Sequence, residues 1–229
     1  MFGNLKTFIH GELVGWKKIE IYWLVFSTVV ILGLSLLWKD SVISTIAAVT
    51  GVWYVILTGK GKRSSFIFGL FNVVFYIIVS WQAKYYGEVI LNAFYYFPMN
   101  FVGWFVWKKH MDDETGEVKK KKLTVKHSVV LYVITLTAVM GCGGMLMLLG
   151  GNLPFVDSIT TVLSVVAQVL AIWRYAEQWI LWIVVNAVST IMWGVNYVRG
   201  GENISTILMW GIYLITAIAM YIRWNKEAK

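Results

Sequence analysis

The chain has little cysteine, little proline and little charge. Its 229 residues include one cysteine, Cys142, and two prolines, and Asp, Glu, Lys and Arg together make up 14%. A single thiol can form neither a disulfide nor a thiolate metal site within one chain. Hydrophobic residues make up 59%, which leaves too little polar surface for a water-soluble globule of this length. The composition therefore predicts a polytopic membrane protein.

Eight apolar stretches approach the length needed to cross a bilayer. A hydrocarbon core about 30 Å thick requires about 20 apolar residues in a helix, so the pattern predicts an all-α fold with eight transmembrane helices and no separate soluble domain. Apolar residues at helical spacing between Phe2 and Trp16 predict an interfacial helix before the first span. The predicted spans are 20–38, 41–58, 64–82, 86–107, 125–148, 157–174, 178–198 and 203–223.

Asp, Glu, Lys, Arg and His are missing from the middle of every predicted span. Ion-coupled transporters usually place an ionisable group or a dense oxygen cage there. The sequence also contains no GxxxxGK[ST] phosphate loop, no HExxH or GxSxG motif and no mid-span lysine for a Schiff base. These absences argue against an energised pump, an intramembrane enzyme and a retinal protein. No metal or cofactor is expected.

The basic residues are distributed unequally between the two sides of the predicted membrane. Seventeen of the 20 Lys and Arg residues lie at the termini or in alternate loops, and only Lys39, Lys84 and Arg199 lie on the opposite side. Positive residues favour the inside, which predicts that both termini are cytoplasmic. The net charge of +8 is spread over short loops and does not indicate a nucleic-acid partner. The loop 108–126 is expected to be solvated, with its lysines near anionic headgroups.

The second half of the chain repeats polar positions of the first half. The interval from the asparagine to the following glycine is fifteen residues in both copies, 72 to 87 and 186 to 201. One helix between the copies gives them the same orientation, which predicts a parallel SWEET-like repeat. The expected parts are an N-terminal segment with one extra helix (1–39), a three-helix bundle (40–110), a loop and linker helix (111–150) and a second bundle (151–229). The repeated positions are Asp40-Ser41, Asn72 and Gly87-Glu88, then Asp157-Ser158, Asn186 and Gly201-Glu202.

Two residues are candidate hinges. Pro98 removes a backbone hydrogen bond in the fourth predicted span, and Gly211 takes the matching place in the second copy. The alternative is a static kink buried within the bundle.

Uncharged amides lie inside several predicted spans. An amide that faced lipid would lose its hydrogen bonds, so each must face protein, water or a ligand. Hydrogen bonding between helices would satisfy any one of them. The repeated pair Asn72 and Asn186, together with Gln168, favours a shared polar cavity, which Asn100 could join.

Aromatic residues accompany these amides. Trp182 lies one turn before Asn186 on the same helix face, and Tyr76 lies one turn after Asn72. Trp53 and Tyr96 could complete an aromatic box, whereas Trp179 suits either an interfacial anchor or a ligand contact.

An aromatic box without carboxylates suits a flat, delocalised and cationic ring that carries a hydroxylated sugar. Stacking and cation–π attraction contribute about 0.5 to 2 kcal/mol per contact, and amides both donate to and accept from hydroxyls. These residues predict a nucleoside-like ligand, although composition alone does not separate it from a plain sugar.

Two strings resemble the PnuC family of bacterial nicotinamide riboside transporters, which are relatives of the SWEET and SemiSWEET sugar transporters. They are Phe68-Gly69-Leu70-Phe71-Asn72-Val73 and Arg174-Tyr175-x-Glu177-x-Trp179-x-x-Trp182-x-x-x-Asn186. The resemblance implies an inner-membrane facilitator, not an enzyme, that moves nicotinamide riboside down its gradient to supply NAD synthesis. It also implies a site between the bundles that includes Trp182, Asn186 and Asn72. Our hypothesis is that Trp182 stacks on the pyridinium ring, while Asn72, Asn186 and Gln168, the last of which is added from its depth in the span, hydrogen-bond the carboxamide or ribose.

Two rival functions stay open at this point. One is a facilitator of sugars or other nucleosides on the same fold. The other is a membrane sensor or binding component whose bundles never alternate. Assembly into a homo-oligomer is also open, with a trimer as the first guess.

Overall fold

The computed structural model describes residues 2–150, 154–200 and 204–228, with side chains from residue 8 onward and without that of Pro154. Eight helical segments in these ranges are long and apolar enough to cross a membrane, which confirms the expected number. Regular structure there is helical apart from two isolated β-bridges. The spans are α2 (Lys18–Leu37), α3 (Val42–Lys60), α4 (Ser65–Gln82), α5–η1–α6 (Tyr86–Lys108), α7 (Val125–Leu148), α8 (Pro154–Ile172), α9 (Gln178–Val198) and α10 (Ile204–Glu227).

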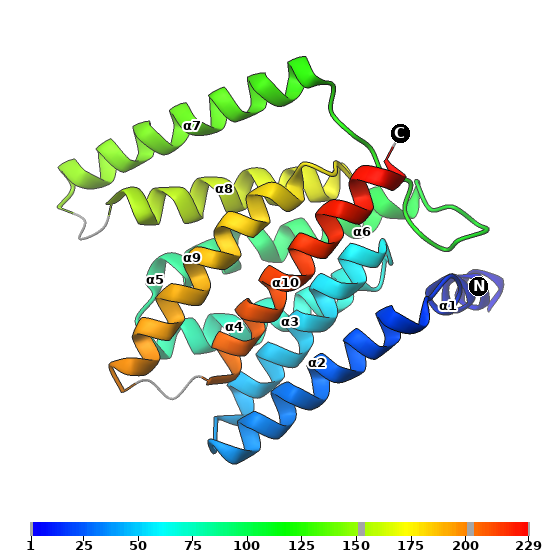
Figure 1. Ribbon diagram of the computed structural model, residues 1–229, viewed down its shortest axis with the longest axis horizontal. Coiled ribbons are helices and arrows are strands. Elements are labelled where there is room, and N and C mark those ends of the chain that lie inside the picture. The colour runs from blue at the N-terminus through cyan, green and yellow to red at the C-terminus, as the bar shows by residue number, and fades with distance from the viewer. Residues whose placement is uncertain (1, 151–153, 201–203, 229) are drawn as a thin grey trace.

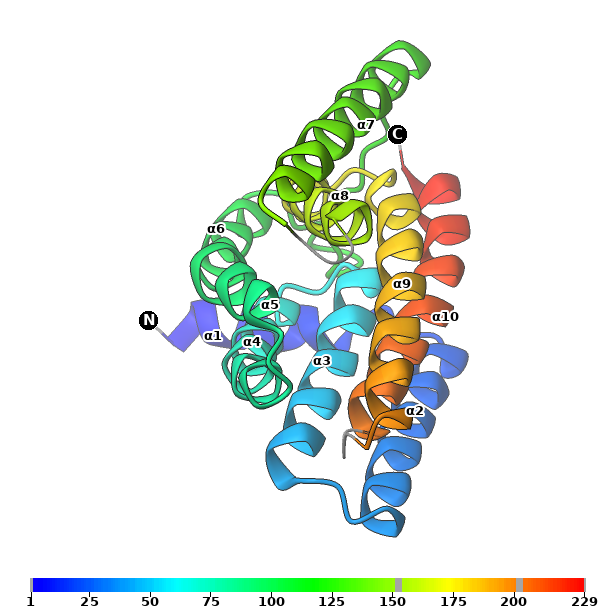
Figure 2. The same ribbon diagram turned by 90° about the vertical axis from the view of Figure 1, so that its left-hand side faces the viewer.

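A short helix precedes these spans. This helix, α1 (Phe2–Leu13), runs crosswise to α2 and α3 at one end of the molecule (Figure 2). The loop 109–124 and the carboxyl-terminal end of α10 lie at the same end (Figure 1). The repeat position Gly201-Glu202 lies outside the described residues.

Two sets of three spans pack in the same way. In the first set α4 packs against α3 and α6, and in the second set α9 packs against α8 and α10. The sets meet where α3 packs on α10 and where α6 packs on α8, so the first span of each set contacts the last span of the other. The remaining spans are peripheral: α2 lies against α3 and α10, and α7 lies along α8 at the opposite edge of the molecule (Figure 1).

The fourth span is interrupted where Pro98 enters it. It consists of α5 (Tyr86–Leu91), a π-helical turn η1 (Asn92–Tyr96) and α6 (Phe97–Lys108). The amide of Phe97 donates to the carbonyl of Asn92, five residues back. Proline supplies no N–H and its ring crowds the carbonyl four residues before it, so the wider π turn accommodates the chain just ahead of Pro98.

The two predicted hinge positions are not structurally equivalent. Pro98 follows an irregular turn, whereas Gly211 lies within the uninterrupted α-helix α10. A Cβ added at Gly211 meets nothing within 4 Å, so packing does not require glycine there.

The loop between α6 and α7 forms backbone hydrogen bonds with both sets of spans. The charge of this loop had predicted a solvated loop instead. The amide of Val118 donates to the carbonyl of Gly61 at 2.9 Å. Further along, the amide of Lys121 donates to the carbonyl of Arg174 at 2.8 Å, and the amide of Ala176 donates back to Lys121 at 2.9 Å. The loop therefore bridges the α3–α4 turn and the α8–α9 turn.

Candidate functional site

A single cavity of about 70 Å³ collects residues from every span of both sets. By volume it could hold roughly five water molecules. Among the described residues that line it there is no Asp, Glu, Lys, Arg or His, in agreement with the uncharged middle of the predicted spans. Seven of the eight predicted ligand residues line this cavity, namely Asn72, Tyr76, Tyr96, Asn100, Gln168, Trp182 and Asn186. The other lining residues are Tyr54, Val55, Thr58, Gly69, Val73, Asn92, Trp179, Met209, Trp210 and Tyr213.

Trp53 is the predicted residue that lies elsewhere. Its indole nitrogen donates to Thr28 Oγ1 at 3.0 Å, and its ring packs on Phe68 with centroids 4.9 Å apart. Trp53 therefore joins α3 to α2 and α4. The next residue, Tyr54, lines the cavity instead, because consecutive residues of an α-helix point about 100° apart.

The amides of the cavity lining also form hydrogen bonds within the protein. Asn72 Nδ2 donates to the carbonyl of Ala47 at 2.8 Å, which joins α4 to α3, and Asn100 Nδ2 donates to the carbonyl of Tyr96 at 2.9 Å. Gln168 Oε1 accepts from the Tyr54 hydroxyl at 3.2 Å, across the boundary between the two sets. The other amide atom of Asn100, Oδ1, and that of Gln168, Nε2, have no hydrogen-bond partner among the described residues.

Several buried polar atoms of this lining have no hydrogen-bond partner among the described residues. An unsatisfied buried donor or acceptor costs about 1–3 kcal/mol, so their concentration around one cavity indicates a polar occupant. Both donors and acceptors are represented, as a ligand with hydroxyl and carboxamide groups requires. These atoms include Asn100 Oδ1, Gln168 Nε2, Trp179 Nε1, Asn186 Oδ1 and the Tyr213 hydroxyl oxygen.

Two glycines, Gly51 and Gly69, leave room for polar side chains of the cavity to pack against the helix backbone. A Cβ at Gly51 would lie 2.2 Å from the Tyr213 hydroxyl oxygen and 2.6 Å from Asn72 Nδ2. A Cβ at Gly69 would lie 2.2 Å from Asn100 Oδ1. All three distances are much shorter than van der Waals contact, so a side chain at either glycine would displace part of the cavity lining.

The aromatic residues of the cavity are held to different degrees. The Trp193 indole donates to the Tyr76 hydroxyl at 3.0 Å, and Trp210 packs edge-on against Tyr76. The rings of Tyr96 and Trp182 come from opposite sets, and their centroids lie 6.4 Å apart with the ring planes at an angle of 33°. Tyr76 is therefore a fixed wall, whereas Tyr96 and Trp182 are two aromatic rings, tilted toward each other, that a planar ring could contact.

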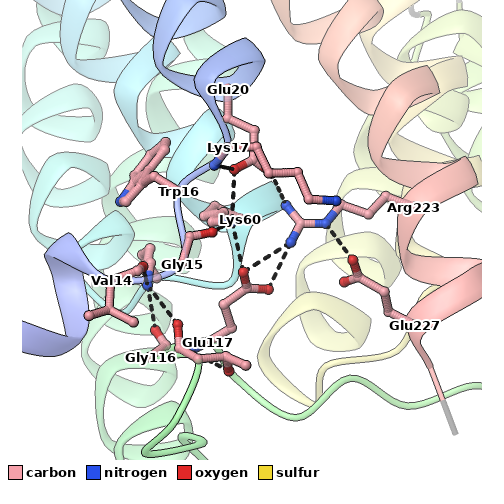
Figure 3. A network of polar contacts seen from close by, with 12 residues as sticks. Val14, Gly15, Trp16, Lys17, Glu20, Lys60, Gly116, Glu117, Arg223 and Glu227 are labelled. Carbon is pink, nitrogen blue, oxygen red and sulfur yellow. Dashed lines mark hydrogen bonds and ion pairs between the residues drawn. The ribbon is translucent and has the colours of Figure 1, made fainter.

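Charged residues close the end of the molecule near the termini (Figure 3). Lys60, the last residue of α3, lies 2.7 Å from Glu20 Oε2 and 2.8 Å from Glu117 Oε1. Arg223 of α10 lies 2.6 Å from Glu20 Oε1 and 2.9 Å from Glu117 Oε2. The two sets are therefore joined through the same two carboxylates.

The surroundings shift the pKa values of two groups at this end of the molecule, Glu117 and Lys62. Burial acts to raise the pKa of Glu117, but ion pairs with Lys120, Lys60 and Arg223 outweigh it and lower the pKa to about 2. Lys62 donates to four backbone carbonyls, those of Gly11, Val14, Thr115 and Gly116, at 2.6 to 3.2 Å. Burial lowers the pKa of Lys62 to about 8, which leaves the amine mostly protonated at neutral pH.

The opposite ends of α3 and α10 are also tied. Asp40 Oδ2, just before α3, accepts from the Ser205 amide at 2.9 Å and from the Ser205 hydroxyl. A carboxylate at a helix amino terminus satisfies free backbone N–H groups and complements the helix dipole. The cavity is therefore enclosed between two polar ties, one at each end of the α3–α10 contact.

Among the described residues, eight helices that can span a membrane, six of which surround an uncharged cavity lined by amides and aromatic rings, define a membrane transporter of small polar molecules. Comparisons with known proteins specify the class further. Residues 41–226 match the family model described as nicotinamide mononucleotide transporter. The chain is 40% identical over 220 residues to the nicotinamide riboside transporter PnuC of Neisseria mucosa, covering 94% of this chain and 84% of that protein.

Other relatives agree. The chain is 34% identical to the nicotinamide riboside transporter PnuC of Haemophilus influenzae, covering 94% of this chain and 93% of the relative. It is also similar to a crystal structure of the vitamin B3 transporter PnuC, with a TM-score of 0.86, 39% identity and 96% coverage of both chains. The chain therefore belongs to the PnuC family of nicotinamide riboside transporters, a family of transporters and not of enzymes, which confirms the resemblance seen in the sequence.

Proposed function

We propose that this chain carries nicotinamide riboside across the membrane and that the enclosed cavity is its binding site. The observation that carries the proposal is the coincidence of unpartnered amide, indole and hydroxyl groups with facing aromatic rings in one uncharged cavity. The names of the relatives in Neisseria mucosa and Haemophilus influenzae support the same ligand.

The chemistry of the riboside matches the lining group by group. Its pyridinium ring is planar and cationic, so the faces of Trp182 and Tyr96 attract it by stacking and cation–π interaction. Its carboxamide and ribose hydroxyls both donate and accept, and Gln168 Nε2 and Asn186 Oδ1 supply one donor and one acceptor. In this proposal Asn72 stays tied to Ala47 and offers its oxygen to the ligand.

The same cavity disfavours a phosphorylated ligand. Relatives are named for the riboside, whereas the matching family model is described by the mononucleotide. Transfer of a phosphate from water into this cavity would require cationic partners, and no Lys or Arg lines it among the described residues. We therefore assign the riboside as the ligand.

Passage through the protein requires the cavity to open. The cavity lies between the two sets of spans, and polar ties join α3 to α10 at both ends of their contact. We infer that the set containing α3, α4 and α6 rocks against the set containing α8, α9 and α10, which alternately releases the Asp40 tie and the Glu117 network. The irregular turn before Pro98 is one flexible point in this proposal, and Gly211 is the other.

In this proposal transport is not coupled to an ion, in keeping with a described cavity lining that contains no Asp, Glu, Lys, Arg or His. In this proposal both termini and the Glu117 network face the cytoplasm of a bacterial inner membrane, since most Lys and Arg residues lie on that side. Assembly into a homo-oligomer is a separate proposal, which light scattering of the detergent-solubilised protein tests.

Uptake of labelled riboside into proteoliposomes tests the function. We expect saturable entry that stops when the inner and outer concentrations are equal and that is unaffected by proton or sodium ionophores. Excess unlabelled riboside should compete, whereas nicotinamide mononucleotide and sucrose should not. Binding without entry would indicate a sensor, and competition by sucrose would indicate a sugar facilitator.

A further inference from the structure

A second concave surface lies outside the transport cavity, between the beginning of α2 and the end of α10. It is a groove of about 530 Å³ whose floor is formed by Ile56 of α3. Its apolar walls are open to the outside, since Ile19, Ile215 and Ile222 are 70%, 55% and 53% exposed. On a membrane protein such an opening faces lipid.

The groove changes from charged to apolar along its length. Lys226 stands at one end and Thr216 at the other, ten residues apart on α10, or about 15 Å along the helix axis. Half of a bilayer core is also about 15 Å thick. Trp23 Nε1 donates to Thr216 Oγ1 at 3.0 Å, which joins α2 to α10 at the deep end. The dimensions therefore fit a lipid of one leaflet.

The charged end of the groove has an excess of cations. Glu20 is paired with Lys60 and Arg223 in the network described above, and Glu227 is paired with Lys120 and Arg223. The remaining two groove cations, Lys17 and Lys226, are exposed and form no ion pair with a described carboxylate. Four cations against two carboxylates line the groove, so two positive charges are available to a ligand at the headgroup level.

We propose that this groove binds an anionic phospholipid from the leaflet at the basic face of the molecule. The phosphate lies between Lys17 and Lys226, and an acyl chain follows the apolar wall toward Trp23 and Thr216. Trp16, which also lines the groove, has the amphipathic indole that favours the membrane interface.

This site borders the network that joins the two sets of spans. Lys60 and Arg223 line the groove on one side and bind Glu117 on the other. A lipid held by α2, α3 and α10 together binds best at one spacing of these helices, and it therefore biases the protein toward that spacing. Anionic lipid is expected to stabilise the arrangement in which Lys60 and Arg223 share Glu117.

Native mass spectrometry of the purified protein with equal amounts of phosphatidylglycerol and phosphatidylcholine tests the site. We expect preferential retention of phosphatidylglycerol, with affinity reduced about 30-fold by the double change Lys17→Gln and Lys226→Gln. The matched control is Lys108→Gln with Lys109→Gln, two exposed lysines at the end of α6, and it should retain the preference.

A second variant separates the groove from simple surface charge. Ala219 is exposed and lines the apolar wall, so Ala219→Trp fills the groove and leaves every charge in place. It should also lose phosphatidylglycerol, while its melting temperature in phosphatidylcholine stays near that of the unmodified chain. Retention of phosphatidylglycerol by both variants, or equally tight binding of glycerol phosphate without acyl chains, would overturn the proposal.

Discussion

Lys60 and Arg223 bind opposite oxygens of one carboxylate, that of Glu117, at 2.8 Å and 2.9 Å. Lys60 ends α3 and Arg223 belongs to α10, so a loop residue joins the two sets of spans that enclose the cavity. Neither cation is near Glu117 in the sequence. The loop therefore takes part in closing the cytoplasmic end that we propose.

The first prediction concerns this carboxylate. Glu117→Gln leaves Lys60, Lys120 and Arg223 with less compensating charge at a mostly buried site. We expect a loss of about 1–3 kcal/mol of stability, between the values for exposed and buried pairs, seen as a lower melting temperature in detergent. Asp112→Asn in the same loop is the control, because its ion pair with Lys119 is long, at 3.9 Å, and exposed. Equal melting temperatures for the two variants would contradict the role of Glu117.

The pH dependence of stability follows from the same group. The pKa of Glu117 is lowered from 4.5 to about 2 in the folded protein. A lowered carboxyl pKa stabilises the fold above the unfolded value, and that stability is lost as the pH falls through the folded value. The melting temperature should therefore change little from pH 7 to pH 5 on account of this group and then fall between about pH 4.5 and pH 2. The Glu117→Gln variant should show a shallower fall over that interval.

The neighbouring residues Trp53 and Tyr54 should respond differently to substitution. Trp53→Phe removes a hydrogen bond to Thr28 outside the cavity, so riboside affinity should stay within about twofold. Tyr54→Phe frees Gln168 Oε1 inside the cavity, and the loss of one buried hydrogen bond of about 1 kcal/mol should weaken binding about fivefold. Titration calorimetry of both variants measures the contrast. A larger effect at Trp53 would place the ligand on the other face of α3.

A methyl group at Gly51 should disturb the cavity. In Gly51→Ala the new Cβ would lie 2.2 Å from the Tyr213 hydroxyl oxygen, so Tyr213 and Asn72 must shift and riboside binding should fall at least about tenfold. Gly211→Ala is the matched control for binding, since a Cβ there meets no atom within 4 Å. It also tests the hinge, because slowed uptake with unchanged affinity would support a flexible point at Gly211. Unchanged riboside affinity in Gly51→Ala would show that the contact is easily relieved.

The sequence was informative where a residue type has few acceptable environments. Amides within a membrane span must find polar partners. This constraint predicted that Asn72, Gln168 and Asn186 would line one shared cavity. Absence of charge in the spans predicted an uncharged cavity for the same reason. The irregularity of the fourth span near Pro98 was predictable, because proline has no backbone N–H to donate within a helix.

Other features depend on information that a sequence pattern does not carry. Trp53 and Tyr54 are both aromatic, and an error of one residue turns the predicted face of the helix by about 100°. Tyr213 lines the cavity beside Gly51, a residue more than 160 positions away in the sequence, and no spacing rule indicates this proximity. The loop residues Val118 and Lys121 bind through backbone groups, which every residue but proline possesses.

Calorimetric titration of nicotinamide riboside into the purified protein and into a Trp182→Ala variant tests the central claim most directly, with nicotinamide mononucleotide and sucrose as further titrants. We expect riboside binding that weakens about tenfold or more in the variant, because one stacking and cation–π face is lost, and no comparable binding of the other two compounds. Riboside binding that survives the substitution, or mononucleotide binding of equal strength, would contradict the proposed site.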